Sequence, residues 1–85
     1  MKYYLYILQS EKSGTYYIGY SHNPALRLEY HNTKEKGFTS RYRPWKMIYT
    51  KEFQTEEEAR RVERKVKLWK SRAMIERLIR GEIQV

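Results

Sequence analysis

The chain has 85 residues and a formal net charge of +8, with 18 Lys or Arg against 10 acidic residues. The length predicts a single domain spanning residues 1–85, and the absence of cysteine excludes disulfides and thiolate zinc sites. The charge predicts a polyanionic partner, with nucleic acid first and an anionic membrane surface second.

The N-terminal segment predicts a β-hairpin. Tyr3 to Leu8 is rich in β-forming residues, Gln9 to Thr15 has the composition of a hairpin loop, and Tyr16 to Tyr20 supplies an antiparallel partner strand. The apolar run Tyr3 to Leu8 is far shorter than the roughly 20 residues of a membrane span, and it lacks the flanks of a signal peptide. We therefore expect a soluble, cytoplasmic protein with no membrane partner.

A helix, a basic loop and a third strand are predicted next. Asn23 followed by Pro24 is typical of a helix start, with the helix running to about His31. Thr33 to Pro44 is predicted to be a loop, and Trp45 to Phe53 a strand with imperfect alternation.

Two further helices are predicted at the C-terminal end. Thr55 and Glu58 form a capping box, and Ser71 is a candidate cap for a last helix that ends at Gly81. The inward positions expected on these helices are Ala59, Val62, Val66 and Trp69, then Met74, Ile75, Leu78 and Ile79. The predicted fold is α+β, a small three-stranded antiparallel sheet flanked by helices in the order β-β-α-β-α-α.

The residue inventory restricts the chemistry. The sequence has no aspartate, only two histidines and no Gly-rich phosphate loop, so aspartate-cluster metal sites and HExxH zinc sites are excluded. Tyr6 and Tyr17 lie on adjacent strands of the hairpin, where two rings pack together in most proteins without any catalytic role. A catalytic role requires a tyrosine hydroxyl that orients or deprotonates a water, with a neighbouring cation that lowers the pKa of the tyrosine.

Three more side chains suit phosphate chemistry. Arg27 and His31 share one helix face, where an arginine can hold a phosphate oxygen and a histidine can accept a proton. Glu63 lies at the border of the apolar stripe, where a carboxylate can bind one divalent cation; a surface ion pair with Lys67 is the alternative.

Basic residues extend over the loop and the long helix. Those expected to contact nucleic acid are Arg41, Arg43, Lys46, Lys67 and Lys70. Trp45 lies among them and is either a stacking platform or part of the core.

Taken together, these residues resemble the GIY-YIG nuclease domain, in its small stand-alone members, over nearly the whole chain. The second half-motif is present as Tyr17-Ile18-Gly19, and the first is Tyr4-Leu5-Tyr6, which keeps only its tyrosine. Arg27, His31 and Glu63 follow in the order and on the elements where the family has its arginine, its His or Tyr, and its metal-binding glutamate.

The resemblance implies a metal-dependent endonuclease acting on nucleic acid, with DNA ahead of RNA. By similarity, Tyr6 or His31 is the general base and Tyr17 assists in the hydrogen-bond network. Arg27 stabilises charge on the phosphorus, and Glu63 holds Mg²⁺ or Mn²⁺. An asparagine found after the glutamate in some members has no counterpart here, and Lys67 or Lys70 would supply that charge.

Two other functions remain open at this stage. One is a non-catalytic nucleic-acid-binding module that kept the fold, and the other is a scaffold whose basic face docks an acidic protein. A protein partner that supplies specificity is compatible with the enzyme. The catalytic hypothesis requires Tyr6, Tyr17, Arg27, His31 and Glu63 to line one concave surface on one face of the sheet.

Overall fold

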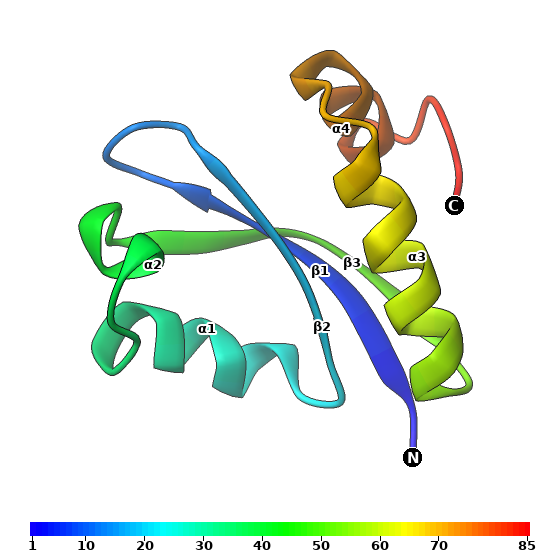
Figure 1. Cartoon of the computed structure of the whole chain (residues 1–85), viewed down its shortest axis with the longest axis horizontal. Coiled ribbons are helices and arrows are strands. Elements are labelled where there is room, and N and C mark those ends of the chain that lie inside the picture. Colours follow the sequence, from blue (N-terminus) through cyan, green and yellow to red (C-terminus); the bar gives the residue numbers. More distant parts are fainter.

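A three-stranded antiparallel sheet organises the protein (Figure 1). In a computed structural model that describes residues 1–85, the strands are β1 (Tyr3–Ser10), β2 (Tyr16–Ser21) and β3 (Trp45–Phe53), in the spatial order β2-β1-β3. The hairpin pairs Tyr6 with Gly19, and β3 runs antiparallel along the other side of β1. The α+β class and all three strands are confirmed, with small shifts at the strand ends.

Four helices complete the fold: α1 (Pro24–Thr33), α2 (Phe38–Arg41), α3 (Glu56–Leu68) and α4 (Arg72–Ile79). The predicted caps form, because a side-chain oxygen accepts a backbone N–H from the first turn of each long helix. Asn23 accepts from Leu26 at 3.1 Å, Thr55 from Glu58 at 3.2 Å and Ser71 from Met74 at 3.2 Å. No helix combines the length and the apolar character that crossing a membrane requires.

Helix α2 is absent from the sequence-based prediction, which made Thr33 to Pro44 a loop. It is a single turn that follows Gly37, and no side chain caps its N-terminus. Its position depends on a tertiary contact, because the Trp45 indole N–H donates to the Thr39 carbonyl at 2.8 Å. A turn held in this way leaves no helical pattern in the sequence.

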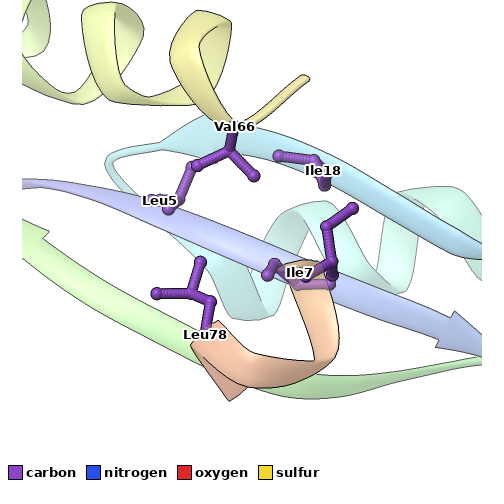
Figure 2. Packing of buried hydrophobic residues seen from close by; sticks show 6 residues of the cluster. Leu5, Ile7, Ile18, Val66 and Leu78 are labelled. Atoms are coloured by element: carbon purple, nitrogen blue, oxygen red, sulfur yellow. The ribbon is translucent and has the colours of Figure 1, made fainter. Parts of the chain in front are cut away.

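The sheet has an apolar core on each face. On one face Leu5, Ile7 and Ile18 pack against α3 and α4, as Figure 2 shows for Val66 and Leu78. On the opposite face, alternate residues of β1, Tyr6 and Leu8, pack with Trp45, and partly buried residues of α1 and β2 complete this second cluster. Trp45 is only 3% exposed, so it belongs to the core. Helices α1 and α2 therefore cover one face, and α3 and α4 the other (Figure 1).

Replacing Leu78 with Ala tests whether α4 belongs to the core. Leu78 is 1% exposed, whereas Leu68 at the end of α3 is 67% exposed. We expect Leu78→Ala to lower the free energy of unfolding by about 2–5 kcal/mol. Leu68→Ala, the control for the same truncation, should leave it nearly unchanged. Urea denaturation followed by circular dichroism measures both; equal stability of the two variants would mean that α4 does not pack as described.

Candidate active site

Tyr6 lies on the central strand directly opposite Gly19, and its ring covers the backbone of that glycine. A β-carbon at position 19 would lie 2.6 Å from the Tyr6 hydroxyl oxygen and 2.7 Å from Cζ, which is too close for any side chain. Gly19 therefore gives the Tyr6 ring room to extend over the edge strand β2. The side chain is 1% exposed.

The Tyr6 hydroxyl meets His31 of α1. Its oxygen lies 3.1 Å from His31 Nε2, in a buried hydrogen bond. The Tyr17 ring packs against the same imidazole with 4.6 Å between ring centres, and the centres of Tyr6 and Tyr17 are 6.4 Å apart. Three of the predicted site residues, one from each of β1, β2 and α1, therefore form a single cluster.

Burial sets the protonation states of this cluster. It raises the pKa of Tyr6 to about 12, although the nearby Arg27 guanidinium acts to lower it. It also lowers the pKa of His31, with the charge of Arg27 acting in the same direction and that of Glu35 opposing. Near neutral pH Tyr6 therefore keeps its proton and His31 is neutral. The hydrogen bond joins a phenol to a neutral imidazole, and its direction depends on which ring nitrogen carries the hydrogen. The lowered tyrosine pKa that Tyr6 needs to act as a base by itself is not found.

Arg27 and Glu35 lie beside this cluster. Arg27 Nη2 is 3.9 Å from Glu35 Oε2, and the guanidinium carbon is 4.8 Å from the centre of the Tyr30 ring. Glu35 Oε2 is also 3.8 Å from His31 Nδ1. Sequence reasoning missed Glu35 because it lies past the predicted helix end. Its spacing of four residues from His31 is the signal that could have identified it.

Glu63 approaches from the other layer. Helix α3 covers the face of the sheet opposite α1, so the convergence of all five side chains around one cleft stays a prediction. Helix α3 nevertheless packs against the edge strand β2, and the charge of Glu63 contributes to raising the pKa of both Tyr6 and Tyr17. The Glu63 carboxylate is 17% exposed and lies 3.4 Å from Lys67 Nζ.

Glu63 is the residue that was predicted to hold a metal ion. Nowhere in the protein do three or more His or Glu side chains gather as a metal-binding group. A single carboxylate fits Mg²⁺, which keeps several waters and takes its remaining ligands from phosphate oxygens. The donor set therefore fits a cation that binds together with a phosphate.

The predicted nucleic-acid contacts separate into two kinds. Arg43 is half-buried and donates from Nε to the His31 carbonyl at 2.6 Å and from Nη2 to the Glu35 carbonyl, so it holds the end of α1. Arg41 and Lys46 are exposed, and neither forms an ion pair. Lys67 pairs with Glu63, and Lys70 follows the end of α3.

Further basic residues gather on α3, the long helix on which the sequence predicted a basic surface. They line a surface hollow of about 390 Å³ formed by Glu57, Arg60, Arg61 and Arg64. Arg61 pairs with Glu57 at 3.0 Å, whereas Arg60 and Arg64 have no acidic partner. The positive surface therefore continues along the helix that carries Glu63.

Known proteins resemble this chain in sequence and in fold. Residues 2–76 match the family described as the GIY-YIG catalytic domain. The chain is 41% identical over 59 residues to UPF0213 proteins of two Streptococcus pneumoniae strains, R6 and TIGR4; the match covers 68% of this chain but only 59% of each relative. The solution NMR structure of UPF0213 protein BH0048 from Bacillus halodurans is similar, with a TM-score of 0.58, 34% identity and coverage of 93% of this chain and 83% of that one.

The raised pKa of Tyr6 predicts a pH-dependent stability. Between its ordinary value of 10.0 and about 12, the folded protein keeps this proton while the unfolded chain loses it, so the free energy of unfolding falls as pH rises. Tyr6→Phe should abolish this contribution, which is at most about 3 kcal/mol. Urea titrations at several alkaline pH values compare the two slopes. Parallel slopes for wild type and variant would show that the Tyr6 pKa is not raised by folding.

Proposed function

The chain belongs to the GIY-YIG catalytic domain family, and from this membership we propose that it is a metal-dependent endonuclease that hydrolyses phosphodiester bonds in nucleic acid, DNA in preference to RNA. The observation that carries the proposal is the buried hydrogen bond between Tyr6 and His31, with Arg27 beside it and the charge of Glu63 acting on the same hydroxyl. A buried Tyr–His pair without a nearby cation and acid would be ordinary core packing.

The proton pathway runs through Tyr6 to His31. The attacking water gives a proton to the Tyr6 oxygen while the Tyr6 proton passes to His31 Nε2, and the water oxygen forms the new bond to phosphorus. The phosphorus–oxygen ester bond on the opposite side breaks, and the leaving oxygen takes a proton from solvent. His31 is thus the base and Tyr6 the group that contacts the water, because a tyrosine with a pKa of about 12 does not ionise alone near neutral pH.

Arg27 and Tyr17 complete the polar surface around the phosphate. Arg27 is half-exposed and donates to the non-bridging oxygens, where negative charge develops as the water attacks. Tyr17 orients the water from β2. When bound at Glu63, Mg²⁺ or Mn²⁺ supplies a Lewis acid for the leaving oxygen.

The nucleic acid follows the positive surface on both sides of the site. Arg41 and Lys46 are exposed on the α2–β3 side, and Arg60 and Lys67 flank Glu63 at helical neighbour positions on α3. These are contacts to the phosphate backbone, which suit a polymer without selecting its sequence. A protein partner would then supply specificity.

Substitutions at Glu63 and Arg27 test the enzyme against the binding module. Glu63→Gln removes the charge that holds the metal, and Arg27→Ala removes the donor to the phosphate. Each should lower Mg²⁺-dependent cleavage at least about 100-fold. Glu56→Gln, the same change at an exposed position of α3, is the control and should cleave normally.

The assay uses labelled single- and double-stranded DNA and RNA, with EDTA as the metal-free reaction. Nucleic-acid binding should survive Glu63→Gln, since the group removed is an anion. Wild-type protein that binds these substrates and yields no metal-dependent product would replace the nuclease with a non-catalytic binding module. Normal cleavage by Glu63→Gln would remove Glu63 from the metal site.

Salt dependence tests the nucleic-acid surface. Replacing Arg41 and Lys46 with Gln should weaken binding and lower the slope of log affinity against log salt by about one for each phosphate that the protein no longer neutralises. Arg77 and Arg80, which pair with Glu82 beyond α4, provide a double-Gln control with the same change in charge. Fluorescence anisotropy at several salt concentrations measures the slopes. Equal slopes for both double variants would mean that the α2–β3 side does not contact phosphates.

A further inference from the structure

The two nitrogens of His31 have different surroundings. Nε2 is hydrogen-bonded to the Tyr6 hydroxyl at 3.1 Å, whereas Nδ1 is buried and has no hydrogen-bond partner. A buried polar atom without a partner is costly, so an unpaired one in a native protein calls for a physical reason. The acidic oxygen beside it is Glu35 Oε2, at 3.8 Å.

The backbone around Glu35 is held firmly. Its N–H donates to the Tyr30 carbonyl at 2.9 Å, and the Arg43 guanidinium donates to the carbonyls of both His31 and Glu35. The carboxylate itself is 30% exposed and also lies 3.9 Å from Arg27 Nη2. A side-chain movement of about 1 Å brings Oε2 within hydrogen-bond distance of Nδ1.

The direction of the Tyr6–His31 hydrogen bond determines whether Nδ1, the nitrogen near Glu35, carries a hydrogen that it can donate. When the Tyr6 O–H donates to Nε2, the neutral imidazole carries its hydrogen on Nδ1. That N–H points toward the side occupied by the Glu35 carboxylate. A carboxylate that accepts from Nδ1 orients the ring and selects this tautomer, as in other carboxylate–histidine pairs.

We propose that Glu35 is a positioning residue that holds His31 through Nδ1, so that Glu35, His31 and Tyr6 form one proton relay. The relay rests on the proposed function of the same site. In it the proton moves from Tyr6 to Nε2, the Nδ1 hydrogen stays in place, and Glu35 stabilises the resulting imidazolium.

The charges around His31 make an acid necessary. Arg27 and Arg43 both disfavour an imidazolium at this position, and Glu35 is the acid that favours it. The other side chains that face the ring are those of Tyr6, Tyr17 and Tyr30, which carry no charge near neutral pH. Without Glu35, protonation of His31 would occur between two cations in a buried site.

The first test is NMR of the histidine side chains, which requires no activity. The chain has only two histidines, so the exposed His22 provides an internal reference. We expect the neutral imidazole of wild-type His31 to carry its hydrogen on Nδ1. Glu35→Gln should lower the pKa of His31 by about 0.5–1, because the charge that favours its protonated form is removed. Glu29→Gln, the same change at an exposed position of α1, should leave that pKa unaltered.

The second test is the pH dependence of cleavage. Glu35→Gln should lower kcat about 10-fold or more near neutral pH and move the acidic limb of the pH–rate profile to lower pH. Glu35→Asp, which keeps the carboxylate, should restore part of the rate. An Nε2–H tautomer in the wild type, or an unchanged His31 pKa in Glu35→Gln, would overturn the relay. A rise in KM for Glu35→Gln, with kcat and the His31 pKa unchanged, would mean that Glu35 acts only through its ion pair with Arg27 and would overturn the relay. Wild-type protein without nuclease activity would overturn the proposed function, and the NMR result would still decide whether Glu35 holds His31.

Discussion

Tyr6 packs against the bare backbone of Gly19, and this contact determines where the other groups of the site lie. Tyr6 belongs to the central strand, whose backbone pairs with β2 on one side and β3 on the other, so it has little freedom to shift. Its ring therefore extends over the edge strand, with the hydroxyl against His31 of α1. A methyl group at position 19 would occupy the space of the hydroxyl and separate the sheet from its contact with the helix.

The same burial that packs these rings keeps them neutral. Desolvation disfavours both a tyrosinate and an imidazolium, so it raises the pKa of Tyr6 and lowers that of His31. A proton shared between two such groups moves along an existing hydrogen bond, and neither group has to carry an isolated charge beforehand. The charged side chains, Arg27, Glu35 and Glu63, lie at the rim, where partial exposure reduces the cost of their charge.

Local rules predicted most of the fold, and the failures involve long-range contacts. The hairpin, the third strand and the helix caps depend on neighbouring residues, so alternation and cap residues were sufficient. Helix α2 depends on the indole of Trp45, a tertiary contact that leaves no helical pattern in the sequence. The hydrogen bonds of Arg43 to two carbonyls at the end of α1 were likewise not predicted. The candidate site residues were predicted from their motif spacing, and their catalytic roles stay predictions. That α1 and α3 cover opposite faces was not predictable, because spacing along the chain does not indicate on which side of a sheet a helix packs.

Two ion pairs join acidic and basic residues of the candidate site. Arg27 is 3.9 Å from Glu35, and Lys67 is 3.4 Å from Glu63. At these distances and this exposure each pair contributes little to stability, so it can exchange partners readily. On the proposed function, a phosphate bound by Arg27 would free the Glu35 carboxylate to interact with His31. Glu63 would hold the divalent cation, which would free the Lys67 ammonium to interact with a neighbouring phosphate. Substrate binding would thus bring the negative charge of Glu35 to His31 Nδ1, where it stabilises the protonated base. The ion pairs with Arg27 and Lys67 would hold the two carboxylates in place before the substrate binds.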